Sequence, residues 1–177
     1  MSLPYYIADC DQRGSGVFAG KTFMTGEFIL CFTGPFKCFE EIADFTHFLQ
    51  VAPDTFMGPS GQADDFVNHS CDPNCAVYLE DDGPVLRALR VILPGEELCF
   101  DYGTIMFSEP TEFDCYCGSS RCRKRVGGFN TMPPGLQNHY LANNAVPLLS
   151  RYTLEELCNR QACHPAGKSC QSSLPAE

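Results

Sequence analysis

The chain has 177 residues, of which 44% are hydrophobic and 19% charged, and this length suits one domain with a sizeable core rather than two. Its 12 Lys and Arg residues against 22 Asp and Glu give a net charge of −10. That charge argues against direct nucleic-acid binding and favours a cationic protein or peptide as partner, although acidic residues also keep a protein soluble.

No run of about 18 apolar residues occurs, so we expect no membrane-spanning helix and no membrane partner. The segment 1–12 lacks the basic stretch and the apolar core of a secretory signal. The 12 cysteines are therefore expected as free thiols and metal ligands in a reducing intracellular compartment, the cytoplasm or nucleus, rather than as disulfides. Nothing in the sequence indicates the oligomeric state.

Short strands separated by Gly, Pro and Asp turns dominate the first part of the chain. The expected strands are 5–8, 16–20, 28–34, 75–79, 85–92 and 97–102. Helical spacing of Ile42, Phe45, Phe48 and Leu49 predicts a helix over 40–50.

The character of the sequence changes after residue 128. Two short helices are expected, at 133–144 and at 153–161, the second with a capping box formed by Thr153 and Glu156. A loose tail rich in Ser, Pro and Gly is expected to follow. The fold class is therefore mainly β (α+β), a β-rich core with helical additions.

Residues 13–19, RGSGVFA, place Gly14 and Gly16 on either side of Ser15, just before a predicted strand. Two glycines allow a ligand to approach the backbone closely. On its own, however, the pattern is explained more simply by a turn, and the third glycine and following helix of a dinucleotide-binding loop are missing.

Residues 66–75, FVNHSCDPNC, allow three interpretations. Asn68-His69-Ser70 is formally a glycosylation sequon, although without a secretory signal that use is disfavoured. His69, Cys71 and Cys75 have the side chains of metal ligands. In the third interpretation, Asn68 and His69 line a binding pocket and one cysteine serves elsewhere.

Residues 114–123, DCYCGSSRCR, contain Cys115, Cys117 and Cys122, a density of thiols that ordinary core packing does not explain. Tetrahedral zinc requires four nitrogen or sulfur ligands, so this segment predicts a metal site whose fourth ligand comes from elsewhere. A looser group near the C-terminus is a weaker second metal candidate: Cys158, Cys163, His164 and Cys170.

Residues 94–103, PGEELCFDYG, contain a turn and then a strand that ends at Tyr102. By itself, such a tyrosine would be read as a packing residue. Together with the three preceding motifs, however, it completes a pattern. Taken in chain order, the four segments resemble the SET-domain family of protein lysine methyltransferases with a post-SET zinc motif, over residues 5–127.

The resemblance implies a SET fold of small curved β-sheets, in which the Asn-His segment and the segment ending at Tyr102 form a pseudoknot. It also implies a SET domain at 1–110, a post-SET zinc-binding segment at 111–127, and a C-terminal helical extension and tail at 128–177. Such threading of chain segments is rare among folds.

The resemblance also implies two cofactors, S-adenosyl-L-methionine and one structural zinc ion. Zinc would be held by Cys71, Cys115, Cys117 and Cys122. The cofactor-binding residues would be Gly14, Ser15, Gly16, Asn68, His69, Tyr102 and Tyr116. Tyr102 would be the catalytic tyrosine, and Phe100 and Phe32 would line the lysine channel.

Methyl transfer requires a neutral amine, and deprotonating a lysine of pKa about 10.4 at pH 7 costs about 4–5 kcal/mol. A sulfonium about 5 Å away disfavours the ammonium by about 3 kcal/mol, and an apolar channel adds to this. No strong base is then needed, so Tyr102 is expected to orient the amine.

The implied substrate is a lysine in a basic protein such as a histone. Because Phe rather than Tyr stands at position 100, the channel is expected to have room for di- or trimethylation.

The alternative is a catalytically silent SET-like module that binds a protein partner. Two departures from the common family pattern favour it. Phe32 stands where many members carry Tyr, and Asp65 stands where an Arg often precedes the Asn-His pair.

Overall fold

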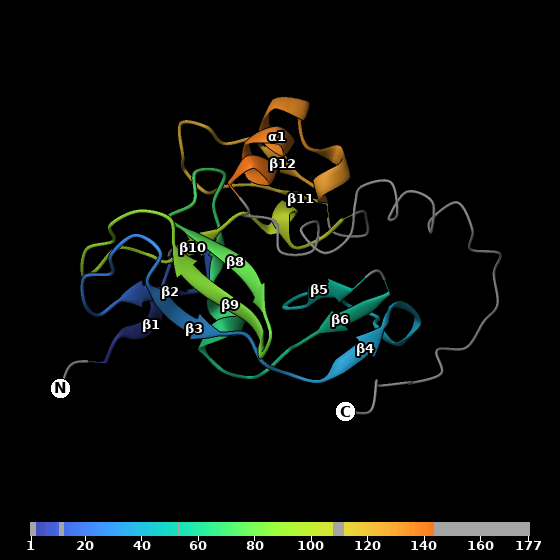
Figure 1. Ribbon diagram of the computed structural model, residues 1–177, viewed down its shortest axis with the longest axis horizontal. Coiled ribbons are helices and arrows are strands. Elements are labelled where there is room, and N and C mark those ends of the chain that lie inside the picture. Colours follow the sequence, from blue (N-terminus) through green and yellow to red (C-terminus); the bar gives the residue numbers. More distant parts are fainter. Residues whose placement is uncertain (1–2, 11–12, 53, 108–111, 144–177) are drawn as a thin grey trace.

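A computed structural model of the chain describes residues 3–10, 13–52, 54–107 and 112–143. These residues form a mainly β fold of five small sheets (Figure 1). The expected fold class is therefore confirmed. No helix in the described part of the chain is long and apolar enough to cross a membrane.

The sheets are small, and most pair strands that lie close in sequence. Two are antiparallel ribbons, β1 (Tyr5–Asp9) with β2 (Ser15–Ala19) and β11 (Phe113–Asp114) with β12 (Arg125–Val126). Two sheets are three-stranded. The strand order in one is β3 (Phe28–Cys31), β9 (Gly83–Ala88), β8 (Cys75–Glu80). In the other it is β4 (Phe36–Cys38), β6 (Thr55–Met57), β5 (Leu49–Ala52). The fifth is parallel, β7 (Asn68–His69) with β10 (Cys99–Phe100).

All six expected strand regions contain a strand, with some changes of extent. The region 85–92 becomes β9, which ends at Ala88, and 97–102 yields only the two residues of β10. A 3-10 turn at Tyr102–Thr104 follows β10 directly. The helix expected at 133–144 is α1 (Pro134–Ala142). The second expected helix, at 153–161, and the second metal candidate lie outside the described residues.

The helix expected over 40–50 is wrong. A 3-10 turn ends at Glu41, whose carboxylate accepts a hydrogen bond from the Cys38 amide, and β5 begins at Leu49. Between them, Asp44 accepts hydrogen bonds from the amide and hydroxyl of Thr46 at 2.9 and 2.6 Å, which closes a turn instead of a helix. The apolar residues of this segment nevertheless pack into the core, so their spacing reflects loop packing.

The parallel pair β7–β10 brings two distant segments side by side, as the family resemblance implies. Asn68 lies opposite Cys99 and His69 opposite Phe100. Asn74 reinforces this contact from the loop that precedes β8: its Nδ2 donates to the Glu97 carbonyl at 2.8 Å, and its Oδ1 accepts from the Cys99 amide at 2.9 Å.

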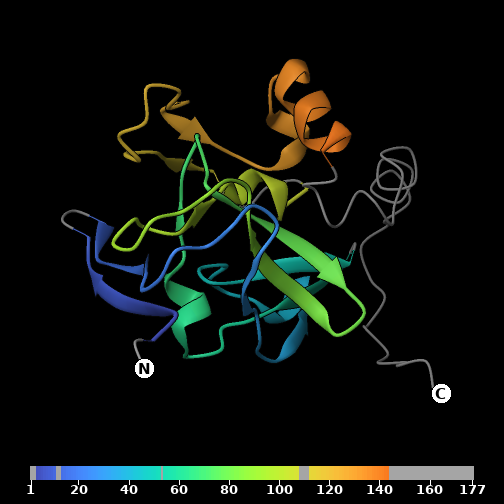
Figure 2. The same ribbon diagram turned by 60° about the vertical axis from the view of Figure 1, so that its left-hand side comes forward.

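The main core lies between β2, the β3–β9–β8 sheet and the β4–β6–β5 sheet, with Val17, Leu86 and Leu98 fully buried. A second apolar cluster lies beneath α1 and includes Phe129 and Tyr140. Figures 1 and 2 both show α1 beside β11 and β12 on one side of the molecule, above β8 and β10. The C-terminal part of the described chain therefore packs against the segment that carries β10.

Asn74→Ala should lower the free energy of unfolding by about 1–3 kcal/mol, because it leaves the part-buried Glu97 carbonyl and the buried Cys99 amide without their partner. Urea denaturation measures this loss. Asn138→Ala, at an exposed position of α1, is the matched control and should change stability by less than about 0.5 kcal/mol. Equal stability of the two variants would contradict the bridging role of Asn74.

Candidate functional site

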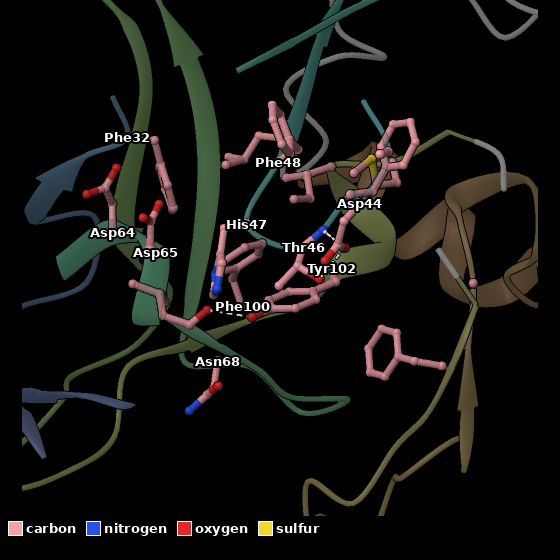
Figure 3. Close-up of a pocket in the computed structure, with 18 residues that line it drawn as sticks. Phe32, Asp44, Thr46, His47, Phe48, Asp64, Asp65, Asn68, Phe100 and Tyr102 are labelled. Atoms are coloured by element: carbon pink, nitrogen blue, oxygen red, sulfur yellow. Dashed lines mark hydrogen bonds between the residues drawn. The ribbon is translucent and has the colours of Figure 1, made fainter. Parts of the chain in front are cut away.

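A cavity of about 590 Å³ opens beside the β7–β10 pair (Figure 3). Three chain segments supply most of its wall: the loop 43–49, the turn before β7, and the stretch from β10 to Met106. The lining residues are Phe32, Ala43, Asp44, Phe45, Thr46, His47, Phe48, Leu49, Asp64, Asp65, Val67, Asn68, Phe100, Tyr102, Ile105, Met106, Phe113 and Gly127. The expected channel residues Phe32 and Phe100 are thus in one wall with Tyr102.

Aromatic rings form a continuous surface along this cavity. Phe32 meets Phe100 edge-on with ring centroids 5.8 Å apart, and Phe100 lies 4.9 Å from Tyr102. Phe113 closes the other side, 5.9 Å from Tyr102. Figure 3 shows Phe100 and Tyr102 facing the same space. Such a wall suits the apolar stem of a long side chain.

Tyr102 carries the only phenolic hydroxyl among the cavity-lining residues. This hydroxyl donates a hydrogen bond to the backbone carbonyl of Val67 at 2.8 Å. Burial raises the pKa of Tyr102 above its ordinary value. At neutral pH the side chain is therefore a protonated phenol whose proton is already donated, so its oxygen faces a ligand as a hydrogen-bond acceptor.

The ring of His69 is buried and engaged on both sides. The Tyr102 amide donates to Nδ1 at 3.2 Å, and Nε2 lies 3.2 Å from the Cys71 sulfur. Burial lowers the pKa of His69 to about 4, so the ring is neutral. Because Nδ1 accepts the hydrogen bond from the Tyr102 amide, the ring proton is on Nε2. The ring thus links Cys71 to the Tyr102 backbone, which leaves the His69 backbone as the part able to meet a ligand.

The glycine loop lies against Asn68. Nδ2 of Asn68 donates to the Ser15 carbonyl at 3.0 Å and to Oε1 of Glu97 at 2.9 Å. Gly14 has a φ of +73°, and a side chain there would meet nothing within 4 Å, so the outer side of the loop is open. At Gly16, by contrast, a Cβ would lie 2.8 Å from the Glu97 carboxylate, so a larger residue would have to displace that hydrogen-bonded side chain.

Glu97 organises this corner, although the sequence analysis did not single it out. Its carboxylate also accepts hydrogen bonds from Arg13 at 2.6 Å and from the Cys10 thiol at 3.2 Å. Burial alone would raise the pKa of Glu97, but the hydrogen bonds from Asn68, Arg13 and Cys10 outweigh it and lower that pKa. The available signal was its place in the motif of residues 94–103, five positions before Tyr102.

Four cysteines gather on the far side of His69. The sulfur atoms of Cys71, Cys115, Cys117 and Cys122 all lie within 4.8 Å of one another. Those of Cys71 and Cys115 are 3.8 Å apart. Four thiolates bound tetrahedrally to zinc at about 2.3 Å would lie about 3.8 Å from one another, so the cluster fits such an ion.

The thiols of the cluster differ in acidity, because burial raises the pKa of Cys71 and of Cys115 whereas that of Cys117 is lowered. Burial opposes ionisation of Cys117, but hydrogen bonds from the Cys71 and Ser119 amides outweigh it and lower its pKa to about 7. A thiolate is the form that binds metal. Cys75 is not part of the cluster: it is fully buried, and its thiol donates to the Asn74 side chain at 3.3 Å.

Tyr116, one of the expected cofactor residues, has a surface side chain. It is 74% exposed and does not line the cavity. Phe113 does line it, with its ring 5.4 Å from that of His69. Phe113 was not among the residues expected from the sequence, although it directly precedes the cysteine motif. A cofactor contact of Tyr116 stays a prediction.

Comparison with known families agrees with this geometry. Residues 14–103, about half of the chain, match the model of the SET domain. The chain belongs to the SET-domain family. The matched range begins at the glycine loop and ends just after Tyr102, so it contains Asn68, Tyr102 and the paired segments between them.

Curated relatives of this SET-domain chain are named as histone methyltransferases. It is 33% identical over 141 residues to "Probable histone-lysine N-methyltransferase set-23" of Caenorhabditis elegans, covering 67% of this chain and 58% of the relative. It is 30% identical to "Histone-lysine N-methyltransferase, H3 lysine-36 specific" of Candida albicans, covering 69% of this chain and 16% of that protein. The chain therefore spans only part of the relatives that it matches.

Solved structures share the fold. Arabidopsis thaliana SUVH6 in complex with SAM matches with a TM-score of 0.61 and 25% identity, over 71% of this chain and 33% of SUVH6. KRYPTONITE in complex with DNA, an H3(1-15) peptide and SAH matches with a TM-score of 0.59 and 24% identity, over 69% of this chain and 29% of KRYPTONITE. The second match shows the fold alone.

The prediction that the cysteine cluster binds zinc is tested by Cys71→Ser. Because Cys71 supplies one of four thiolates, the variant should lose most of the zinc bound by the wild-type chain, as measured by atomic spectroscopy of the purified protein. Cys31→Ser, at an exposed cysteine outside the cluster, should keep its zinc. Unchanged zinc content in Cys71→Ser would contradict the shared site.

Proposed function

We propose that the chain is an S-adenosylmethionine-dependent protein lysine N-methyltransferase. The observation that carries this proposal is the position of Tyr102. Its hydroxyl faces an aromatic cavity that Asn68 also lines, and Asn68 is hydrogen-bonded to the open glycine loop. An acceptor for a lysine amine and a candidate cofactor loop therefore meet at one place.

The residues around the glycine loop fit the cofactor. Gly14 leaves the loop open, Asn68 lies between the loop and the cavity, and the His69 backbone continues the same surface along β7. These residues would hold the amino-acid and adenine parts of S-adenosylmethionine through backbone groups and the Asn68 amide. When bound, S-adenosylmethionine would supply the methyl group: the lysine nitrogen would attack the methyl carbon, the C–S bond would break, and S-adenosylhomocysteine would leave. SAM is named with SUVH6 and SAH with KRYPTONITE.

Tyr102 would orient the amine rather than remove its proton. Its raised pKa makes it a poor base, and its own proton is donated to Val67. The phenol oxygen can then accept an N–H of the lysine, which fixes the direction of the nitrogen lone pair. The rings of Phe32 and Phe100 exclude water and disfavour the charged ammonium, so the neutral amine becomes easier to form.

The cavity walls favour a cationic substrate. Asp44, Asp64 and Asp65 line the cavity, and its lining residues include no Lys or Arg. Backbone amides hold the acids in place: Thr33 donates to Asp64 at 2.9 Å and Gly61 donates to Asp65 at 2.7 Å. We infer a basic protein such as a histone as the substrate. The names of the relatives and the H3 peptide named with KRYPTONITE agree with this class. Such a substrate places the protein in the nucleus or cytoplasm.

The cysteine cluster would hold one structural zinc ion. Cys71 follows β7 closely, whereas the other three cysteines belong to the segment 111–127, so the ion would tie that segment to the β7–β10 pair. This supports the division into a SET domain at 1–110, a post-SET segment at 111–127 and a C-terminal extension from 128. Phe113, on the same segment, would then stay in place beside Tyr102.

The second candidate, a catalytically silent binding module, is favoured by Phe32 and Asp65, the two departures from the common family pattern. Phe32 places a ring without a hydroxyl in the channel, so no second phenol lies beside Tyr102 to hydrogen-bond the amine. The two functions are separated by methyl transfer: a silent module would bind the cofactor without modifying any lysine.

Tyr102→Phe should lower kcat for lysine methylation by about 100-fold or more, because the amine loses its orienting acceptor. The dissociation constant for S-adenosylhomocysteine, measured by calorimetry, should change little. Tyr6→Phe on β1 removes an exposed hydroxyl and should leave kcat unchanged. Full activity of Tyr102→Phe would remove the tyrosine from the mechanism.

Phe100→Tyr should shift the product from di- and trimethyl-lysine towards monomethyl-lysine, because an added hydroxyl occupies space in the buried channel. Mass spectrometry of a modified peptide gives the three product fractions. Phe28→Tyr, at an exposed position, is the control and should keep the wild-type distribution. A wild-type enzyme that stops at one methyl group would contradict the proposed product range.

A further inference from the structure

A buried carboxylate lies next to Tyr102 in the chain. Asp101 is 1% exposed. Arg123 binds it through two parallel hydrogen bonds of 2.6 and 2.7 Å, and the Gly103 amide donates to Oδ1 at 3.1 Å. A fourth donor, the hydroxyl of Tyr140 on α1, lies 2.8 Å from Oδ2. A buried charge of this kind is stable only when such partners surround it.

Tyr140 therefore brings the C-terminal helix into contact with the active-site strand. It is 4% exposed, and burial together with the Asp101 charge raises its pKa, so its hydroxyl stays protonated as a donor. The donors come from three separate segments of the chain, at positions 103, 123 and 140. None of the expected site residues is on α1.

The geometry around Asp101 determines where Tyr102 lies. The Asp101 side chain caps the 3-10 turn Tyr102–Thr104, and its carbonyl accepts from the Thr104 amide and hydroxyl at 2.9 and 2.6 Å. The Tyr102 amide is itself held by His69. A shift of the Asp101 carboxylate would turn this short segment, and the Tyr102 ring would move with it.

We propose that Tyr140 is a positioning residue for Tyr102, which acts by fixing Asp101 from the C-terminal helix. The inference rests on the proposed methyltransferase function and extends it: the complete catalytic unit includes α1, beyond the post-SET segment. Tyr140 itself does not line the cavity, so its effect passes through Asp101.

A purely structural role for Tyr140 would be to dock α1. That role has its own matched control, because Gln137 on the same helix donates to the Phe129 carbonyl at 2.7 Å without approaching Asp101. Gln137→Met removes this docking bond and keeps the side-chain length. Loosening of the helix and misplacement of Asp101 can therefore be measured separately.

The experiment compares Tyr140→Phe with Gln137→Met in the full chain. Tyr140→Phe should lower kcat by about 10-fold, with KM for S-adenosylmethionine within about 2-fold, because one of four hydrogen bonds that position the turn is lost. Gln137→Met should keep kcat within about 2-fold of wild type, although it too removes a hydrogen bond that docks α1. In Asp101→Asn, adding Tyr140→Phe should cause little further loss of kcat.

Amide hydrogen exchange provides a readout without activity. At Tyr102, exchange should be faster in Tyr140→Phe than in Gln137→Met. If the wild-type chain methylates lysine, equal kcat values for the two variants overturn the positioning role. If the wild-type chain binds cofactor but transfers no methyl group, the proposed function fails. Equal exchange rates at Tyr102 then overturn the positioning role independently.

Discussion

The parallel pairing of β7 with β10 is the contact on which the rest of the site depends. It places Asn68 opposite Cys99 and His69 opposite Phe100, although these residues are about thirty positions apart in the chain. Asn68 continues from this pair towards the glycine loop, and Tyr102 continues from it into the aromatic cavity. The proposed cofactor loop and the proposed lysine channel can therefore meet without either being built from a long element.

The same short segment also reaches the cysteine cluster. Cys71 lies two residues beyond His69, and the His69 ring links its sulfur to the Tyr102 backbone. Asp101 makes a comparable connection with Arg123 and Tyr140. Both links are buried and hydrogen-bonded at each end. A displacement at one end therefore shifts the other end, which flexible surface contacts would not do. Arg123 and Tyr140 thus contact the segment that carries Tyr102 from outside the cavity.

How much was predictable depended on the sequence distance of each interaction. Turn residues and alternating apolar positions are local signals, so all six expected strand regions and α1 were found. The helix at 40–50 failed because Asp44 closes a turn with Thr46, which apolar spacing does not reveal. The gathering of Cys71 with Cys115 has no local signal either, and it was expected only through the family resemblance. Nothing marked Tyr140, which lies 39 positions from Asp101.

The most direct measurement is methyl transfer itself. The wild-type chain is incubated with methyl-labelled S-adenosylmethionine and core histones, and tandem mass spectrometry locates the label. The account predicts label on lysine side chains, with more than one methyl group on some of them. Binding of the cofactor without label on any lysine of the histones or of the chain itself would contradict it, and would leave a SET-domain module that binds partners without modifying them.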